Sequence, residues 1–559
     1  MDVYEARKAH GGKARSQALA GTGRGGRRDL PGEHGFRFFP AFYRHVIDTM
    51  QRIPYGADGG RVSDNLRAST EAGVAFANDE PVLRFLRRAP SSPRELIDGM
   101  ETAFSRMGVS YADALLYTER VLRYYTSCPE RRLDVYEKMS WWDYLGADRY
   151  APMFQRYQAA IPRIMVAMDA RLGSARTIGD ISAQLIVDFS SSGTDKDRVL
   201  NGPTTDKWLA PWASYLARRG VRFHLDRPVR SIRTEGRTVV EVDIEGEPDL
   251  VRADYYLLAV PIEAVRPLVS DAMANTDPSL GRLKHLPQRR FDRLTNWMNG
   301  LQFYLRRDVP IVAGHTFYPD APWAMTSISQ PQFWREDGAF EERFGDGSAK
   351  GLISIDLSDW FSPGTYVNKP ASECTPDEVA AEVWQQLKAG LNARGDVVLR
   401  DDDRVGYHLD DDLERASGGG GFANRSRLLV HPPGSWQYRP EATTAFENLT
   451  LAGDYVRTHT DLATMEGANE SARRAVNGII EHSGLLHSPC DVWPLREPAL
   501  FAPAVRLDQR LDQSGWSGKR HAFDLWPGSV QTVAGLARTV ELLLQGRPEM
   551  GMEEPRMAA

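Results

Sequence analysis

Cysteine is scarce in this sequence. Its 559 residues include three cysteines, Cys128, Cys374 and Cys490, and no two of them form a CxxC pair. This rarity excludes a disulfide-stapled scaffold and a cysteine-rich zinc site, and it is typical of a reducing compartment. No apolar run reaches the roughly 18 residues that a membrane-spanning helix needs. The N-terminus lacks a basic segment followed by an apolar stretch, so we find no signal peptide and expect a cytoplasmic protein.

An excess of charge of one sign is also lacking. Lys and Arg number 69 against 75 Asp and Glu, which gives a net charge of −6. Without a basic excess to attract phosphates, the composition argues against a nucleic-acid binder. Hydrophobic residues make up 42% and charged residues 26% of the chain, as in ordinary globular proteins. At roughly 100–200 residues per domain, the length predicts two to four domains.

Helical and strand-like patterns alternate along the chain. The pattern predicts helices over Phe36–Ile53, over most of 93–193, and at 208–219, 376–392, 465–482 and 532–545. It predicts strands at Asp2–Ala6, 297–305, 352–356 and 449–452. Four further short strands between 221 and 260 are expected to form a meander that ends on a buried strand.

Two motifs near the chain ends carry chemistry. The first strand ends in Glu5, shortly before Gly11-Gly12. In dinucleotide-binding folds such an acid hydrogen-bonds ribose hydroxyls, and nearby glycines let a phosphate or flavin approach the backbone. Near the other end, Gly453-Asp454 directly follow a predicted strand. The N-terminal amides of the helix that comes next can donate hydrogen bonds to an electron-rich group. Taken alone, the Glu5 motif is better explained as a strand followed by a surface turn, and the Gly453-Asp454 motif is equally well explained as a structural strand, loop and helix.

Together these motifs resemble the superfamily of FAD-dependent amine oxidases and phytoene (carotenoid) desaturases. The resemblance spans residues 2–482 in the family's order, and the matching segments are Val3-Tyr4-Glu5-Ala6, Gly11-Gly12-Lys13-Ala14-Arg15-Ser16, Gly202–Ile232, Asp254–Pro261, Leu451-Ala452-Gly453-Asp454 and Met465-Glu466-Gly467-Ala468. It implies an α/β fold in which a Rossmann-like FAD-binding domain of the glutathione-reductase type carries an inserted α+β substrate domain. The FAD-binding domain would comprise residues 1–59, 201–261 and 421–489, the substrate domain 60–200 and 262–420, and a C-terminal extension 490–559.

The resemblance also implies roles for single residues. The implied cofactor-binding positions are Glu5, Gly11, Gly12, Lys13, Ala14, Arg15, His34, Val229, Gly453, Asp454, Glu466, Gly467 and Ala468. Glu5 would hold the adenosine ribose, Val229 would contact adenine through its backbone, and Asp454 would bind the ribityl–pyrophosphate region. The 466–468 turn would present a helix N-terminus to the flavin pyrimidine edge. Glu33 and His34 form a titratable pair suited to proton transfer, although a turn leading into a helix explains them as well.

The main departure from the family lies at the beginning. The superfamily opens with a strand and a GxGxxG turn that cradles the pyrophosphate, whereas here Met1 falls where the second strand should begin. The glycines from Gly21 to Gly26 cannot replace that turn, because no strand precedes them and no helix opens within them. We therefore expect a Rossmann sheet without its first strand, caused either by a start site placed too late or by truncation of the chain. Without that strand we expect this chain to bind flavin weakly. A non-catalytic remnant that lost FAD is the alternative.

The activity implied by the resemblance is that of an FAD-dependent oxidoreductase with non-covalent FAD, which transfers a hydride between a substrate C–H bond and flavin N5. Polyamine-oxidase-like members place a lysine near N5, and the matching segment Thr295–Leu301 contains none. This difference favours the desaturase-like branch, with lipophilic, isoprenoid-like substrates, over a flavin amine oxidase. The sequence assigns no catalytic residue, electron acceptor or oligomeric state.

The remaining candidates are interpreted as structural. The aromatic residues Trp141, Trp142, Phe303, Tyr304, Trp323 and Trp334 are expected in the core rather than around a pocket. Asp401–Asp403 and Asp410–Asp412 lack spaced partners, so we expect solvated loops and no metal. The glycines 418–421 are expected to form a loop. The apolar stretch Met165–Leu172 is a candidate for peripheral membrane contact, with core packing as the alternative.

Overall fold

The computed structural model describes residues 1–77, 80–86, 108–190, 197–393, 395–416, 420–497, 501–516 and 521. The chain divides into two compact units. Unit 1 comprises Met1–Arg87, Arg156–Gly173 and Lys196–Leu495, and unit 2 comprises Arg88–Gln155, Ser174–Asp195 and Arg496–Ala559. These units are defined by compactness, so the functional division into an FAD-binding and a substrate domain stays a prediction.

The largest sheet of unit 1 has seven strands in the order β18-β14-β17-β16-β15-β6-β7. They are β18 (Arg404–Leu409), β14 (Asn299–Leu305), β17 (Gly351–Leu357), β16 (Met325–Ser329), β15 (Gly314–Tyr318), β6 (Glu71–Val74) and β7 (Leu83–Leu86). Neighbours run antiparallel except for β15 and β6. Every residue of β14, β16 and β17 is buried. The strands predicted at 297–305 and 352–356 are confirmed as β14 and β17.

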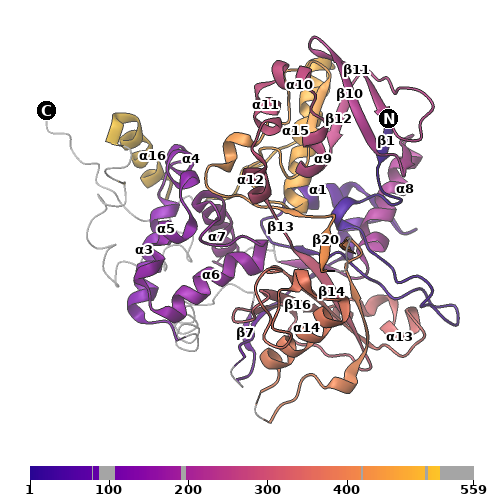
Figure 1. Ribbon diagram of the computed structural model, residues 1–559, viewed down its shortest axis with the longest axis vertical. Coiled ribbons are helices and arrows are strands. Elements are labelled where there is room, and N and C mark those ends of the chain that lie inside the picture. The colour runs from indigo at the N-terminus through magenta and orange to yellow at the C-terminus, as the bar shows by residue number, and fades with distance from the viewer. Residues whose placement is uncertain are drawn as a thin grey trace. The chain divides into compact units, whose positions relative to one another are not determined.

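Helix α14 (Pro376–Leu391) covers one face of this sheet (Figure 1). A capping box stabilises its start, because the Thr375 side chain accepts a hydrogen bond from the Glu378 backbone N–H. Its buried Trp384 meets Phe303 of β14 edge to face, with ring centroids 4.9 Å apart. Phe303, Tyr304, Trp323 and Trp334 are all buried. The prediction that these aromatic residues belong to the core is confirmed.

Two pairs of parallel strands form the part of unit 1 that corresponds to the expected dinucleotide-binding sheet. β1 (Asp2–Glu5) pairs with β9 (Arg222–Leu225), and β12 (Tyr256–Ala259) pairs with β22 (Leu449–Ala452). Among the described strands, β1 and β22 have no further partner. The expected sheet is therefore present as two pairs that share no ladder of hydrogen bonds.

The meander predicted between 221 and 260 is wrong. Only β10 (Val229–Glu235) and β11 (Thr238–Ile244) form an antiparallel hairpin. The flanking strands β9 and β12 instead take parallel partners from the two ends of the chain. Local alternation of apolar residues predicts a strand but does not reveal a partner that lies hundreds of residues away.

Helices α9 (Ile262–Leu268), α10 (Asp271–Thr276), α11 (Pro278–Lys284) and α15 (Met465–Ser483) pack on β12 and β22 around one hydrophobic cluster (Figure 1). On α15, Ser471 and Ala475 are fully buried, whereas Ala468 is exposed. A Cβ on Gly478 would lie 2.5 Å from Thr443 Cγ2. Small side chains thus let this helix approach β22 closely.

The helix predicted over Phe36–Ile53 is shorter in the structure. Only α1 (His45–Arg52) is helical, and Phe38–Phe39 forms β2, which joins a small sheet with β8 (Arg198–Leu200) and β5 (Leu66–Ala68). Pro40 explains the difference, because proline disfavours a helical conformation of the residue before it. The remaining elements of unit 1 are β3 (Pro54–Tyr55), β4 (Gly60–Arg61), α8 (Ala210–Arg218), α12 (Gln288–Phe291), β13 (Thr295–Asn296), α13 (Phe340–Arg343), β19 (Leu413–Arg415), β20 (Phe422–Asn424) and β21 (Leu428–Leu429).

Unit 2 is helical where it is described. Its helices are α3 (Tyr111–Tyr125), α4 (Pro129–Asp134), α5 (Trp141–Leu145), α7 (Ala175–Ser190) and α16 (Ala502–Leu511), and α6 (Pro152–Val166) begins in it. A buried ion pair between Arg131 and Asp508, at 2.8 Å, joins α4 to α16. Trp141 and Trp142 lie in its core as predicted. The predicted helix near 532–545 and glycines 418 and 419 lie outside the described residues.

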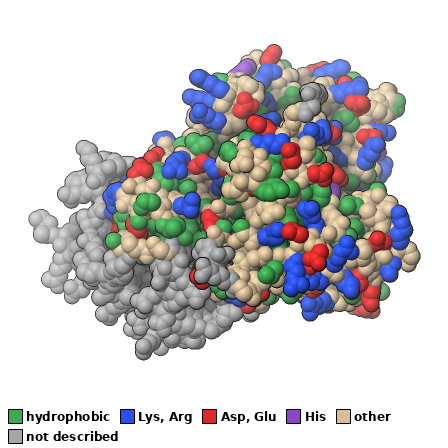
Figure 2. Space-filling model, turned by 60° about the horizontal axis from the view of Figure 1, so that its bottom comes forward, with side chains coloured by type: hydrophobic (Ala, Val, Ile, Leu, Met, Phe, Trp, Pro, Cys, Tyr) green, Lys and Arg blue, Asp and Glu red, His purple; other side chains and the backbone are tan. Residues whose placement is uncertain are grey.

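The described surface mixes both signs of charge. On the face that Figure 2 shows, Lys and Arg side chains are interspersed with Asp and Glu, in keeping with the small net charge of −6. Within the described ranges, no helix has the length and apolar character that a bilayer crossing needs.

Candidate functional site

The segments that follow β1 and β22 meet in unit 1. Lys13, in a short helical turn after β1, donates its Nζ to the Arg427 carbonyl and lies 4.0 Å from Asp454 Oδ2. Both side chains are partly open to solvent, with 25% of Lys13 and 16% of Asp454 exposed. Glu5 ends β1, and its Oε1 accepts a hydrogen bond from the Arg7 backbone N–H at 2.9 Å. Two of the predicted cofactor residues, Lys13 and Asp454, are thus close together although they are far apart in sequence.

A third carboxyl group, missed by sequence reasoning, lies in the same region. Glu263 stands in the first turn of α9, directly after the matched Val260-Pro261 segment. Burial raises the pKa of its carboxyl group, and Asp454 raises it further, while the Lys13 charge acts in the opposite direction. Its Oε1 is buried and has no hydrogen-bond partner among the described residues. This oxygen is available to a ligand hydroxyl.

Two predicted glycines are required by the backbone itself. Gly11 has a φ of +107°, and a Cβ there would lie 2.5 Å from Leu209 Cδ1. Gly453 has a φ of +124°, and a Cβ there would lie 3.0 Å from the Val260 carbonyl oxygen. These conformations disfavour any residue with a side chain. The Gly453 N–H donates to Ser471 Oγ at 2.9 Å, which fixes the turn after β22 on helix α15.

The Glu466 side chain has a different role from the one expected for its turn. Its carboxylate accepts hydrogen bonds from the backbone N–H groups of Arg44, His45 and Val46 at 2.7, 2.8 and 3.0 Å. It also lies 2.7 Å from His45 Nδ1 and is buried. This carboxylate therefore caps the N-terminus of α1. Only the backbone of the 466–468 turn remains for the predicted cofactor contact.

Arg439 organises the loop after β22 and was missed by sequence reasoning. It is buried, forms an ion pair with buried Asp461, and donates to the carbonyl groups of Asp454, Tyr455 and Val456. Its Nη1 also lies 3.2 Å from His431 Nδ1. A single buried arginine leaves no periodic pattern in the sequence, so no local rule reveals it.

The segment around Glu33 and His34 is pressed against the end of the seven-stranded sheet. Glu33 accepts hydrogen bonds from Ser16 Oγ at 2.8 Å and from the Thr204 N–H at 2.9 Å, and burial raises the pKa of its carboxyl group. His34 Nδ1 lies 2.6 Å from Asp410 Oδ2. A Cβ on Gly35 would lie 2.6 Å from Asp356 Oδ1. The chain thus gathers several buried titratable groups at this point.

The prediction of solvated aspartate loops is wrong for Asp403, Asp410 and Asp412, which are buried, and right for Asp401, Asp402 and Asp411, which are exposed. Burial works against ionisation of Asp412, but hydrogen bonds from Ser426, Arg7 and Arg15 hold its pKa below the usual range. His34, Asp410 and Asp412 place possible metal-ligand atoms within 4.8 Å of one another. Since two arginines already compensate the Asp412 charge, we assign no cation to this cluster.

Asp356 gives this region a pH dependence. Burial raises the pKa of its carboxyl group to about 7, although the Arg37 charge opposes the rise. The folded-state pKa of Asp356 lies above its unfolded value, so between about pH 4 and pH 7 the carboxyl group ionises more readily in the unfolded protein. The free energy of unfolding is therefore highest below about pH 4 and falls by up to about 4 kcal/mol as the pH rises toward 7. Asp356→Asn should therefore gain stability relative to wild type between pH 5 and pH 8, measured by urea denaturation at each pH. If the difference in free energy of unfolding between Asp356→Asn and wild type stays constant over this pH range, the prediction is wrong.

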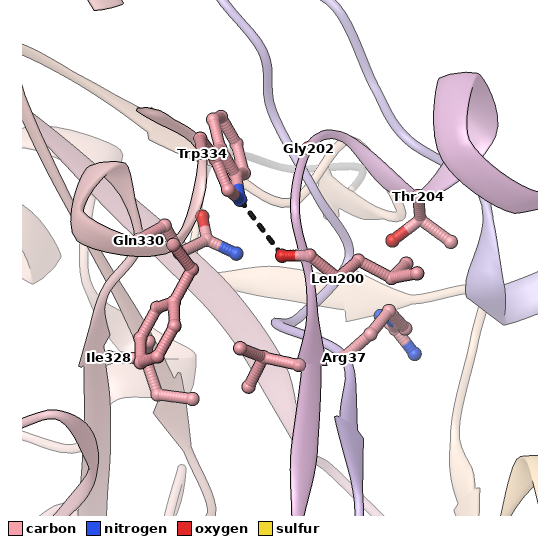
Figure 3. A pocket seen from close by; sticks show the side chains of 9 residues that line it. Arg37, Leu200, Gly202, Thr204, Ile328, Gln330 and Trp334 are labelled. Atoms are coloured by element: carbon pink, nitrogen blue, oxygen red, sulfur yellow. Dashed lines mark hydrogen bonds between the residues drawn. The ribbon is translucent and has the colours of Figure 1, made fainter. Parts of the chain in front are cut away.

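Two cavities in unit 1 differ in what they can hold. The first, lined by Arg37, Thr204 and Trp334 among others, has a volume of about 10 Å³. Figure 3 shows it beside the hydrogen bond from Trp334 Nε1 to the Leu200 carbonyl (3.2 Å). It has room for about one water molecule. The second measures about 730 Å³ and is lined by residues from 163–173, 286–296, 358–362 and 430–438. Its size falls within the range of small-molecule sites.

One stretch of chain connects the Lys13–Asp454 region to the wall of the large cavity. Arg427 accepts the Lys13 hydrogen bond, β21 follows and pairs with β13, and Val430 and His431 then line the cavity. Thr295 and Asn296 of β13, in the segment without lysine, also line it. Asn296 Nδ2 donates to the Ala167 carbonyl at 2.7 Å and so ties the 163–173 segment to this wall.

Comparisons with known proteins agree with this arrangement. The family model described as flavin containing amine oxidoreductase matches residues 1–480. The zeta-carotene desaturase of Synechocystis sp. (strain ATCC 27184 / PCC 6803 / Kazusa) is 22% identical over 309 residues. That alignment covers 52% of this chain and spans just over half of the desaturase, 56% of its length.

Solved structures show the same fold. An oxidoreductase from Methanosarcina mazei matches with a TM-score of 0.53 at 11% identity, covering 86% of this chain and 94% of that one. The cyclohexylamine oxidase from Brevibacterium oxydans IH-35A matches with a TM-score of 0.52 at 12% identity, covering 86% and 93%. Because the family model covers most of the chain and the fold agrees, this chain belongs to the family of flavin-containing amine oxidoreductases.

Proposed function

We propose that this protein binds FAD non-covalently and transfers a hydride between a C–H bond of a lipophilic substrate and the flavin, as a desaturase-like dehydrogenase. The observation that carries the proposal is the approach of Lys13 to Asp454, which joins the matched segments from the two ends of the chain. FAD, when bound, supplies the hydride chemistry. The protein residues bind the cofactor, orient it and exclude water.

The donor and acceptor groups in this region fit FAD. Lys13 offers a cation for the pyrophosphate, and Asp454 and Glu5 offer carboxylates for hydroxyl groups. The unpartnered Glu263 Oε1 adds a buried acceptor beside them. Gly11, Gly12, Ala14, Arg15, Val229, Gly467 and Ala468 complete the proposed set through backbone or neighbouring contacts. Arg15 is partly committed, because it bonds the Gly12 carbonyl at 2.8 Å and Asp412 at 2.9 Å.

Attachment of FAD through cysteine is disfavoured. Burial raises the pKa of the Cys374 thiol to about 11 and that of Cys128 to about 12, so neither is an available thiolate. Cys490 lies after the last matched segment. We therefore propose a cofactor held by hydrogen bonds and charge alone.

Buried titratable groups are available for proton transfer. His34 is held by Asp410 at 2.6 Å, and Glu33 is held by Ser16 and Thr204. Burial favours the protonated form of Glu33, so this carboxyl group can store a proton. We propose that the Glu33–His34 pair exchanges protons beside the cofactor.

The desaturase-like branch is favoured over a flavin amine oxidase by two observations. No lysine occurs in Thr295–Leu301, two of whose residues line the large cavity. A curated relative is a carotenoid desaturase. An amine oxidase remains the second candidate, because it shares the family and the fold.

Asp454→Asn tests the cofactor assignment. Losing a charged hydrogen-bond acceptor costs about 1.5–3 kcal/mol, so we expect FAD affinity to fall about 10- to 100-fold. Affinity would be measured by titrating FAD into the purified protein and following flavin fluorescence, so that weak binding is also quantified.

The exposed Asp402→Asn serves as the matched control and should leave FAD affinity unchanged. Equal affinities for Asp454→Asn and wild type would remove Asp454 from the site. No FAD binding by the wild-type protein at any concentration would contradict the proposal that this chain binds FAD.

A further inference from the structure

The charges of the large cavity are unbalanced. Its lining includes four arginines, Arg163, Arg171, Arg290 and Arg293, against two aspartates, Asp169 and Asp359. Both aspartates form ion pairs with the same arginine, Arg163. No carboxylate of the described part of the chain lies within ion-pairing distance of Arg290 or Arg293. On its 290–293 side the cavity therefore presents positive charge that no carboxylate of the described residues pairs with.

Arg290 and Arg293 stand together around the end of α12. Arg290 Nη1 donates to the Tyr438 hydroxyl at 2.7 Å, which positions its guanidinium without neutralising it. Both arginines are exposed, so their charges remain solvated and able to meet a ligand. A guanidinium group carries several N–H donors in a planar arrangement that suits carboxylate and phosphate oxygens.

Another part of the lining, formed by residues 167–172 and 361, is mostly apolar. Ala167, Met168 and Leu172 line the cavity, and so does Phe361. Leu172 and Phe361 are 65% and 56% exposed, which is high for large apolar side chains. Apolar surface next to a cavity is characteristic of a site that covers an apolar ligand.

We propose that this cavity binds an amphiphilic anion, a lipophilic molecule with a carboxylate or phosphate end. The anionic end lies at Arg290 and Arg293, and the apolar part contacts Leu172 and Phe361. This inference rests on the proposed function, because it names the substrate class of the same enzyme. It also argues against an amine substrate, because Arg290 and Arg293 would repel a cationic amine.

The test is a displacement assay on the full 559-residue chain, with dansyl-undecanoate as the fluorescent probe. Laurate and dodecyl phosphate, at monomeric concentrations, should both displace it, whereas dodecylamine and inorganic phosphate should displace it at least about tenfold more weakly. Equal displacement by the amine would overturn the anionic end. Equal displacement by inorganic phosphate would overturn the apolar part and reduce the site to one for free phosphate.

Charge-reversal variants test whether the probe binds at Arg290 and Arg293. Arg290→Glu/Arg293→Glu should weaken probe binding about tenfold and strengthen dodecylamine binding, because the sign of the local charge is reversed. Arg289→Glu is the matched control: it is exposed on the same helix but does not line the cavity, and it should leave both affinities unchanged. Probe binding that is insensitive to the double variant would overturn the assignment.

The result is independent of the flavin assay. FAD binding without probe binding would overturn this inference and leave the proposed function standing. Probe binding in a protein that takes up no FAD would support the cavity assignment and contradict the proposal that this chain binds FAD.

Discussion

Arg439→Met is expected to destabilise unit 1 by about 3–5 kcal/mol, because it removes the guanidinium that forms a buried ion pair with the Asp461 carboxylate. The variant also removes the hydrogen bonds that hold the carbonyl groups of Asp454, Tyr455 and Val456. We therefore expect a lower urea midpoint, followed by far-UV circular dichroism, and weaker FAD binding under conditions where the protein is still folded.

Arg457→Met is the matched control. Arg439 and Arg457 both stack on the Trp436 ring, with guanidinium carbons 5.3 and 5.0 Å from its centroid. Arg457, however, pairs with Glu441 near the surface, and exposed pairs contribute about 0–1 kcal/mol. The double variant Arg439→Met/Asp461→Leu should recover part of the loss, since no buried charge is then unpaired. Similar losses for Arg439→Met and Arg457→Met would show that the buried ion pair is not the cause.

Glu466→Gln is expected to destabilise the protein by about 1–3 kcal/mol. The carboxylate serves three backbone N–H groups of α1, and each buried N–H left without an acceptor costs about 1–3 kcal/mol. An amide turns one acceptor oxygen into a donor that faces these N–H groups. The expected readouts are a lower urea midpoint and faster hydrogen exchange of the Arg44, His45 and Val46 amides.

Glu481→Gln, on the exposed surface of the same helix, is the control and should leave stability within about 0.5 kcal/mol. Comparing the two variants also distinguishes two possible roles of the Glu466 side chain, capping of α1 and contact with the cofactor. If its side chain caps α1, stability falls far more than FAD affinity does in the folded protein. A large loss of FAD affinity with unchanged stability would mean that the carboxylate contacts the cofactor instead.

The sequence determined the elements whose patterns are local. The strand that ends at Glu5, the strand before Gly453 and the helix from Met465 are where the apolar periodicity predicted them. The helix predicted over 376–392 is present as α14 (Pro376–Leu391). These signals are readable because a strand or helix repeats its pattern over a few neighbouring residues. The family resemblance rested on these same segments, and the family assignment was confirmed.

The tertiary structure decided the strand partners and the environment of the acids. Asp412 is buried because Arg7, 405 positions away, reaches its carboxylate, and nothing beside Asp412 in the sequence indicates this. Glu466 caps a helix that begins 421 positions earlier. The parallel pairing of β9 with β1 and of β12 with β22 likewise joins distant segments. A charge is stable in the interior only when a partner compensates it, and which partner arrives depends on the whole fold rather than on the local pattern.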